Sequence, residues 1–314
     1  MQCPHCHTEL YDTDRFCPHC GKPRPCPASP FKKGVAAIAK AVGFVLLFLV
    51  VQSATSGIYS GILVVQNIMA SGGNLSEAEL YDSIYNALYQ NISLVSLISG
   101  LITILFLALF FAVQQKNMFA EIHLRKVKPS MILWAALAGA AFNIFISVTI
   151  NFLPLPDAWF AGLEEQYSYL GEQNSLLLEI LTTSVLTGFL EETIFRGLVD
   201  SRLRTGLPTW LSVILSALIF GLCHGTPIAI GYAFVVGLVF SLLFLRHGSI
   251  LPSIVCHMCF NLTSIFLTTD NPVLLLGLYL ISIGTLLFAF YMLFRRDDAA
   301  PDVPQIEKLP TDKN

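Results

Sequence analysis

Eight apolar stretches constrain the fold of this sequence more than any other feature. The first begins near Val35, and no charged residue follows Lys40 until Glu77. This first stretch is expected to be long, tilted or broken near Gly57 or Gly61. The other seven cover residues 92–114, 131–152, 174–200, 208–224, 228–245, 249–267 and 273–294. About 20 apolar residues are needed to cross a bilayer as a helix, and here 54% of the residues are hydrophobic and only 12% are charged. The sequence therefore predicts an all-α polytopic membrane protein with about eight transmembrane helices.

Residues 74–91, between the first two apolar stretches, have the pattern of a short amphipathic helix. Ser76 and Glu79 form a capping-box pattern, which marks the start of a helix. Apolar residues then recur at helical spacing, at Leu80, Ile84 and Leu88. Such a helix is expected to lie on the membrane surface.

The basic residues divide cleanly when the N-terminus is placed in the cytoplasm and the eight spans alternate. All 18 Lys and Arg then fall in or beside cytoplasmic segments, while the external loops carry acidic residues such as Glu77, Asp157 and Asp270. Positive charge marks the cytoplasmic side of membrane proteins. We therefore expect a multi-pass protein with both termini in the cytoplasm, in the plasma membrane of a bacterium. The polar tail is expected to be disordered.

Four cysteines near the N-terminus form two Cys-x-x-Cys knuckles, Cys3 with Cys6 and Cys17 with Cys20. Two such knuckles supply the four thiolates of a tetrahedral structural zinc site. A small zinc ribbon that folds around its metal is therefore predicted. The histidines inside the knuckles are alternative ligands, and a pair of disulfides in a secreted segment is the alternative to metal. The ribbon is expected to face the cytoplasm, where it is available to a protein partner.

Three groups of polar residues remain inside the predicted spans once the flanks are removed. They are Glu191, Glu192 and Arg196 in one span, His224 in the next, and His257 with Asn261 in a third. Ionisable groups at membrane depth are costly and mark functional sites. On a helix, Glu192 and Arg196 share a face and can pair, which leaves Glu191 free. Each group alone has a structural alternative, an ion pair or a hydrogen bond between helices; together they predict one shared polar cavity.

These side chains have the chemistry needed to hydrolyse a peptide bond. A glutamate takes a proton from water while a histidine orients that water, and a second histidine and an asparagine amide donate hydrogen bonds to an oxyanion. The sequence has no recognisable serine or cysteine nucleophile motif and no His-Glu-x-x-His zinc motif. Two histidines and a glutamate can also hold a catalytic metal, which is the less favoured mechanism. For Glu191 to meet His224, the helix must continue to about Arg202.

The three groups resemble, in order, the motifs of the CAAX protease and bacteriocin-processing family of intramembrane proteases, also called the CPBP or Abi family. The family's motifs are E-E-x-x-x-R, F-x-x-x-H and H-x-x-x-N, and the matching segments begin at Glu191, Phe220 and His257. The resemblance covers residues 176–267 and leaves the zinc ribbon outside the family's core. It implies that Glu191 and His224 activate water. It also implies an oxyanion hole of His257 and Asn261, supported by Glu192 and Arg196.

The implied function is an intramembrane endopeptidase that cuts a peptide or protein near the cytoplasmic side of the membrane without a catalytic metal. The alternatives are a non-cleaving bacteriocin self-immunity protein or peptide-binding scaffold, and a transporter whose polar cluster binds an ion. The expected partners are the substrate, the lipid bilayer and a protein bound by the ribbon, with no nucleic acid. The predicted domains are a zinc ribbon (1–24), a linker (25–33), transmembrane helices with the amphipathic helix (34–170), a catalytic core (171–270), a last transmembrane helix (271–296) and a disordered tail (297–314).

Overall fold

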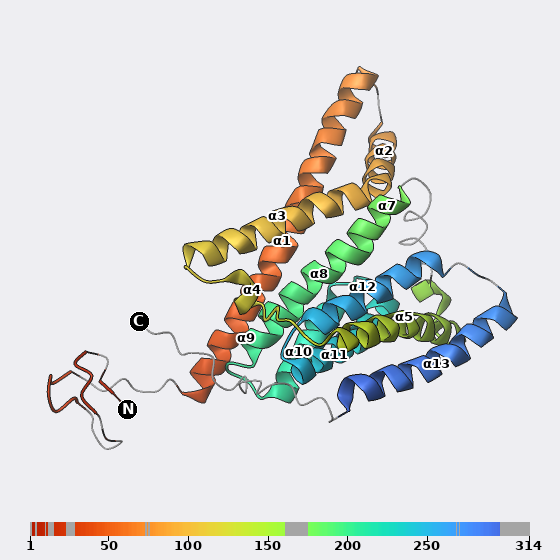
Figure 1. Cartoon of the computed structure of the whole chain (residues 1–314). Helices are drawn as coiled ribbons and strands as arrows, with labels where there is room; N and C mark the ends of the chain where they lie inside the picture. Colours follow the sequence, from red (N-terminus) through yellow and green to blue (C-terminus); the bar gives the residue numbers. More distant parts are fainter. Residues whose placement is uncertain are drawn as a thin grey trace.

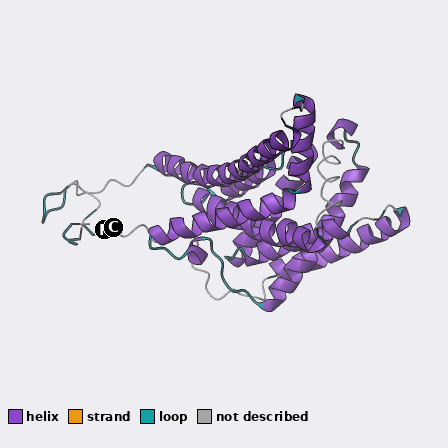
Figure 2. Ribbon diagram, turned by 90° about the horizontal axis from the view of Figure 1, so that it is seen from above, coloured by secondary structure: helices purple, strands orange, loops and turns teal. Residues whose placement is uncertain are grey.

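From Pro30 onward, the part of the chain that the structure describes is built of helices joined by loops, whereas the N-terminal residues form loops (Figures 1 and 2). The computed structural model describes residues 2–3, 5–9, 11, 16–22, 29–72, 74, 76–160, 175–267, 269 and 271–295. Gln2 and Glu9 pair in an isolated antiparallel bridge, and every longer regular element in the described residues is a helix. The predicted all-α membrane fold is confirmed. Residues 25–28 of the predicted linker and the tail from 297 to 314 lie outside the described residues.

Seven long helices coincide with predicted apolar stretches. They are α1 (Pro30–Ser71), α3 (Ile92–Val113), α5 (Pro129–Phe152), α10 (Thr209–Leu222), α11 (Pro227–His247), α12 (Leu251–Phe266) and α13 (Pro272–Phe294). The first of them runs for 42 residues without a break, so it is long rather than divided. By length and composition, α1, α3, α5, α11 and α13 are candidate membrane spans, whereas α10 and α12 are shorter apolar helices. The count of eight spans is not confirmed by these criteria.

Short helices connect the long ones in the part of the chain that the structure describes. The amphipathic segment forms α2 (Glu77–Gln90), and both arms of its capping box are present. The Ser76 backbone N–H donates to Glu79 Oε2 at 2.9 Å, and the Glu79 backbone N–H donates to Ser76 Oγ at 3.3 Å. The bonds from Ser76 lower the pKa of the Glu79 carboxyl. Another short helix, α4 (Met118–Glu121), is capped by the Asn117 side chain and was not predicted.

The two adjacent glutamates lie on one continuous helical segment from Leu176 to Leu203, which we call the glutamate helix. It consists of α7 (Leu176–Glu179), η1 (Ile180–Leu186), α8 (Thr187–Glu192), η2 (Thr193–Asp200) and α9 (Ser201–Leu203). The expected continuation of this helix to about Arg202 is confirmed. The segments η1 and η2 are π-helical, which the sequence did not indicate. Such turns are rare and are frequently found at functional sites, and here they flank the glutamates on both sides.

The helices enclose two buried apolar clusters, and the glutamate helix belongs to the first of them. The first packs that helix against α1, α3 and α10, with Phe48 and Phe220 among its members. The second joins α5, α11, α12 and α13, with Phe142 and Phe240 among its members. Figure 1 shows α5, α12 and α13 lying together, and the glutamate helix contacts α12 through α8 and η1 and α1 through η2. The glutamates therefore lie at the boundary between two packed layers.

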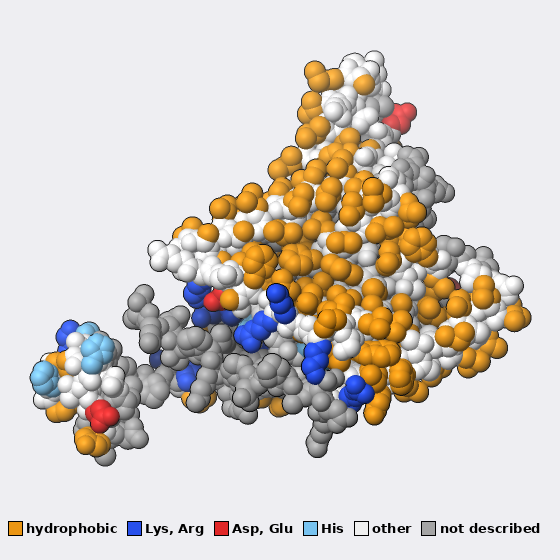
Figure 3. All heavy atoms as spheres, in the orientation of Figure 1, with side chains coloured by type: hydrophobic (Ala, Val, Ile, Leu, Met, Phe, Trp, Pro, Cys, Tyr) orange, Lys and Arg blue, Asp and Glu red, His pale blue; other side chains and the backbone are white. Residues whose placement is uncertain are grey.

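The basic side chains of the helical bundle are unevenly distributed on the face seen in Figure 3. Lys and Arg side chains gather along one end of the bundle, while hydrophobic side chains cover most of the remaining visible face (Figure 3). This distribution is the one expected of a membrane protein that follows the positive-inside rule.

Gly139 on α5 allows the backbones of α5 and α12 to touch beside the site described below. A Cβ atom added at Gly139 would lie 2.0 Å from the carbonyl oxygen of Cys256, the residue that precedes His257. We therefore expect Gly139→Ala to push α12 away from α5 and to lower the free energy of unfolding by roughly 2–3 kcal/mol. The matched control is Gly43→Ala on α1, where a Cβ atom meets nothing within 4 Å. Thermal unfolding in detergent measures both variants, and equal midpoints would contradict this packing.

Candidate active site

Glu191 and Glu192 end α8 and point in different directions. The Glu192 side chain is fully buried, whereas 18% of the Glu191 side chain is exposed. Adjacent residues of a helix are separated by about 100° around its axis, so only one of the two carboxylates enters the core. The pair therefore offers one sealed carboxylate and one that water or a substrate can reach.

Arg196 neutralises the sealed carboxylate. Its Nη1 donates to Glu192 Oε1 at 2.8 Å, and its Nη2 donates to the carbonyl oxygen of Gly237 at 3.0 Å. The guanidinium carbon also lies over the rings of Phe220 and Phe240, at 4.4 and 5.2 Å from their centroids. The ion pair predicted from the four-residue spacing is confirmed, and both of its side chains are fully buried. A buried pair of this kind is strongly destabilised when one partner is removed.

His257 on α12 connects the two glutamates. Its Nδ1 is 3.0 Å from Glu192 Oε1, and its Nε2 is 3.8 Å from Glu191 Oε2. The imidazole lies between Phe240 and Phe220, with ring centroids 4.8 and 6.0 Å away. Donation from Nδ1–H to Glu192 fixes the orientation of the ring and directs Nε2 toward Glu191. The glutamate that is sealed in the core thus positions the imidazole beside the glutamate that is accessible.

His224 follows the end of α10 and lies against the same aromatic wall. Its Nδ1 is 2.9 Å from the carbonyl oxygen of Phe220, and its ring packs edge-on against the Phe220 ring at 4.8 Å. The Tyr232 ring of α11 is 6.4 Å away. The Phe220 ring therefore contacts both imidazoles. With Nδ1 facing a backbone carbonyl, Nε2 is the ring atom that His224 offers to water or substrate.

Asn261 lies one turn beyond His257 on α12 and is anchored to the glutamate helix. Its Nδ2 donates to the carbonyl oxygen of Thr183 in η1 at 2.9 Å. A second bond, from Ser184 Oγ to the carbonyl oxygen of Met258 at 2.7 Å, joins the same two helices. A carboxamide carries two N–H groups, and one of them holds the helices together here. The oxyanion role predicted for Asn261 therefore depends on its other N–H.

These contacts determine what the site can do chemically. One contiguous group is formed by Glu191, Glu192, Arg196 and His257. His224 contacts the Phe220 ring, which also contacts His257, and Asn261 lies on α12 with His257. A partly exposed carboxylate beside an imidazole is an acid–base pair. Among the described residues, only the N-terminal cysteines bring three or more potential metal ligands together. The contact between Glu191 and His257 supplies two ligands, fewer than the three protein ligands of a typical catalytic zinc site.

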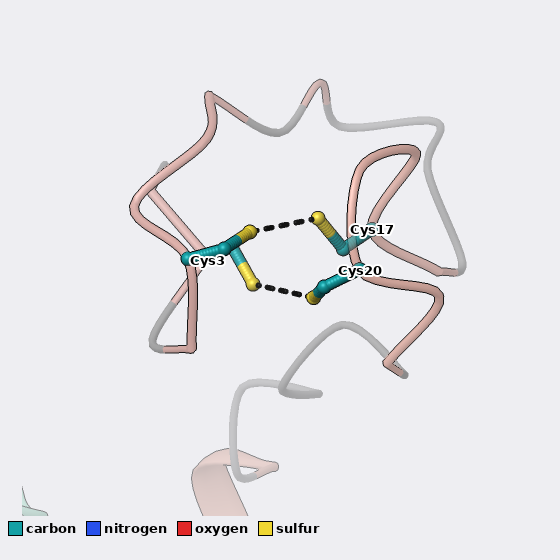
Figure 4. Close-up of side chains that lie close together, drawn as sticks. Cys3, Cys17 and Cys20 are labelled. Atoms are coloured by element: carbon teal, nitrogen blue, oxygen red, sulfur yellow. Dashed lines mark hydrogen bonds between the residues drawn. The ribbon is translucent and has the colours of Figure 1, made fainter.

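The N-terminal cysteines converge on one point (Figure 4). The sulfur atoms of Cys3 and Cys20 are 3.6 Å apart, those of Cys6 and Cys17 are 3.5 Å apart, and all four lie within 4.8 Å of one another. Four thiolates bound at about 2.3 Å to a tetrahedral ion are about 3.8 Å apart, so this arrangement fits zinc. Disulfide sulfur atoms lie about 2.05 Å apart, so the disulfide alternative does not fit.

Backbone turns hold the two knuckles of the ribbon. The Cys3 N–H donates to the carbonyl oxygen of Thr8 at 2.9 Å, and the Cys17 N–H donates to that of Lys22 at 2.8 Å. Gly21 completes the second knuckle in the left-handed region, with φ of 68°. Hydrogen bonding to Thr8 lowers the pKa of the Cys6 thiol to about 5, which favours the thiolate that a metal requires.

We expect the protein to contain about one zinc per chain. Replacing both cysteines of the first knuckle, Cys3→Ser with Cys6→Ser, should remove the metal and unfold the ribbon, because two ligands remain, while the helices stay folded. Elemental analysis and circular dichroism measure the two effects. The matched control, Cys223→Ser with Cys259→Ser, replaces thiols of the helical part and should retain the zinc. Zinc that persists after loss of the first knuckle would contradict the assignment and reveal a second metal site.

Several residues that build the site were not found from the sequence. Phe240 and Gly139 carry no motif, and only the contacts between helices show that they shape the surroundings of His257. Asp200 and Arg204 did leave a signal, because they continue the four-residue spacing of Glu192 and Arg196 along the glutamate helix.

Two family models match this chain. Residues 173–263 match the family described as type II CAAX prenyl endopeptidase Rce1-like, and residues 2–24 match the zinc-ribbon domain. Neither a curated protein nor a solved structure gives a match. A region similar to zinc ribbons therefore precedes a helical region similar to Rce1-like endopeptidases, and the second region contains both glutamates, Arg196, both imidazoles of the site and Asn261.

Proposed function

Because residues 173–263 match an Rce1-like endopeptidase domain, we propose that the protein is an intramembrane endopeptidase in which Glu191 acts on a water molecule. The observation that supports this proposal is the difference in exposure between the two adjacent glutamates. Glu192 is sealed with Arg196, whereas Glu191 is partly exposed and lies 3.8 Å from His257 Nε2. That separation is longer than a hydrogen bond, so Glu191 keeps its lone pairs for water.

In the proposed reaction, Glu191 removes a proton from water as the oxygen attacks the carbonyl carbon of the peptide bond. His224 Nε2 orients this water, and the negative charge that develops on the carbonyl oxygen is stabilised by the Nε2–H of His257, whose Nδ1–H stays on Glu192, and by the Asn261 N–H that is not bonded to Thr183. The proton taken up by Glu191 passes to the departing amine as the C–N bond breaks. Glu192 and Arg196 do not touch the substrate in this scheme; they hold His257 in place.

We place the reaction within the membrane, toward the cytoplasm. Glu191 precedes the end of the glutamate helix at Leu203 by twelve residues, or roughly 18 Å of helix. The gathering of Lys and Arg at one end of the bundle (Figure 3) supports a cytoplasmic assignment for that end. Both termini are then cytoplasmic, and the zinc ribbon is placed to bind a protein partner or to deliver a substrate.

A comparison of protein termini in cells tests the proposed function. Cells that carry the wild-type protein should contain newly formed termini, close to a membrane-spanning or membrane-bound segment, that are missing from cells with Glu191→Gln at equal expression. The sequence around these termini would also identify the substrate. Identical termini in both strains would overturn the protease assignment and favour the peptide-binding scaffold.

A further inference from the structure

Two hydrogen bonds that run in opposite directions join the π-helical segment η1 to α12. Ser184 Oγ donates to the carbonyl oxygen of Met258 at 2.7 Å. In return, Asn261 Nδ2 donates to the carbonyl oxygen of Thr183 at 2.9 Å. We call these two bonds the clamp. Each helix supplies one donor and one acceptor, so the clamp fixes both the distance and the register between η1 and α12.

The π-helical register of η1 explains why the Thr183 carbonyl is available to another helix. A carbonyl in an α-helix accepts the N–H of the residue four positions later, which for Thr183 is Thr187. Here the Thr187 N–H donates instead to the carbonyl oxygens of Thr182 and Ser184, and α8 resumes the α-helical pattern at Thr187. The change of register therefore releases the Thr183 carbonyl from Thr187 and offers it to Asn261.

The clamp lies next to the contact between Glu192 and His257. His257 directly precedes Met258 along α12. On the glutamate helix, Gly188 lies one turn after Ser184, and a Cβ atom added there would be 2.8 Å from Met258 Cγ and 3.2 Å from Met258 N. The two helices are therefore in close contact between the clamp and the candidate active site. Since packed interiors transmit displacements, a shift of α12 at the clamp also moves the His257 ring.

The Ser184 hydroxyl holds α12 without being required to satisfy a buried acceptor. Met258 lies within α12, so the α-helical pattern already pairs its carbonyl with the N–H of Leu262. Ser184 is itself only 2% exposed and so is closed off from a substrate. Removing its hydroxyl should therefore leave the protein folded and affect the position of α12. This distinguishes Ser184 from Arg196, whose loss leaves a buried charge unpaired.

We propose that Ser184 is a positioning residue of the candidate active site, which acts through the clamp to hold His257 Nε2 at its 3.8 Å separation from Glu191 Oε2. The inference rests on the proposed function. Hydrogen-bond donors stabilise a developing oxyanion only when they are held within about 0.5 Å of their productive positions. Because the clamp fixes the helix that carries both His257 and Asn261, its loss should slow the chemical step and leave binding of the substrate nearly unchanged.

Steady-state cleavage by reconstituted protein, with a peptide taken from its cellular cleavage sites, tests this proposal. Ser184→Ala should lower kcat by about 10- to 100-fold and change KM by less than about twofold. Ser184→Thr keeps the hydroxyl and should recover most of the rate. The matched control is Ser99→Ala, because Ser99 is also buried and its Oγ joins α3 to α1 by donating to Gln52 Oε1 at 2.6 Å. The control should cleave at the wild-type rate. Wild-type kcat in folded Ser184→Ala, or an equal loss in the control, would overturn the proposal.

Nuclear magnetic resonance tests the same role without a substrate. In protein labelled with nitrogen-15 at histidine, the Nδ1 signal of His257 is identified by its loss in His257→Gln. This signal should shift or broaden in Ser184→Ala but stay in place in Ser184→Thr and Ser99→Ala. If Ser184→Ala does not fold, Ser184→Cys keeps the shape with a weaker donor and serves for both measurements. Wild-type protein that cleaves nothing would remove the proposed function, whereas a His257 signal that is unchanged in folded Ser184→Ala or Ser184→Cys would remove the role of Ser184.

Discussion

Glu191→Gln is expected to lower kcat/KM for peptide cleavage by about 10³-fold, because a general base contributes roughly 10²–10⁴-fold. Glutamine has the shape of glutamate, but its amide does not take a proton from water. The side chain is partly exposed and lies 3.8 Å from His257 Nε2, so the substitution should change the free energy of unfolding by less than about 1 kcal/mol. Single-turnover cleavage by reconstituted protein, with thermal unfolding in parallel, measures both quantities.

The matched control for this variant is Glu179→Gln. Glu179 ends α7 on the same glutamate helix, twelve residues before Glu191, and has no place in the candidate site. Its neutral variant should cleave at the wild-type rate. A Glu191→Gln protein that retains activity within about threefold of wild type would exclude Glu191 as the base and direct attention to His224.

Arg196→Met should be the most destabilising single substitution in the site, by roughly 3–5 kcal/mol. Methionine preserves much of the packing against Phe220 and Phe240, but it leaves the fully buried Glu192 carboxylate without a cation and the Gly237 carbonyl without its donor. Chemical or thermal unfolding in detergent measures the loss. Cleavage should also fall in the protein that remains folded, because Glu192 no longer holds His257 in a fixed position.

Two further variants test whether the loss of stability comes from the unpaired Glu192 charge rather than from removal of an arginine side chain. Arg202→Met removes a partly exposed partner of Glu121 and should cost about 1 kcal/mol or less. The double variant Glu192→Gln with Arg196→Met leaves no unpaired buried charge, so it should recover part of the stability lost by Arg196→Met. If the double variant were less stable than the single one, the buried charge of Glu192 would not be the source of the loss.

The helices could be predicted from the sequence because a bilayer demands long apolar segments. The predicted range 92–114 became Ile92–Val113, and 273–294 became Pro272–Phe294. The pairing of Glu192 with Arg196 could also be predicted, because four-residue spacing brings two side chains together on any helix. The spacing of the four N-terminal cysteines likewise predicted that their sulfur atoms come together. The ion pair is local along the chain, and the cysteine site closes within a segment in which the paired sulfur atoms are at most 17 residues apart.

The features that escaped prediction depend on contacts between helices. Nothing in the spacing of residues shows that His257 Nδ1 turns to Glu192 while Nε2 turns to Glu191. The bond from Asn261 to the Thr183 carbonyl depends on how α12 lies against η1. The π-helical segments also belong to this class, because apolar composition alone does not distinguish a π-helical turn from an α-helical one.

Cleavage of a membrane-bound peptide in water enriched in oxygen-18, followed by mass spectrometry, tests the central claim most directly. The purified wild-type protein, reconstituted in lipid vesicles with a peptide found from its cellular cleavage sites, should produce two fragments. The new carboxyl terminus should carry one oxygen from the solvent, and Glu191→Gln should yield neither fragment. Folded wild-type protein that binds this peptide but leaves it intact, or Glu191→Gln protein that cuts it at the wild-type rate, would contradict hydrolysis by water activated at Glu191.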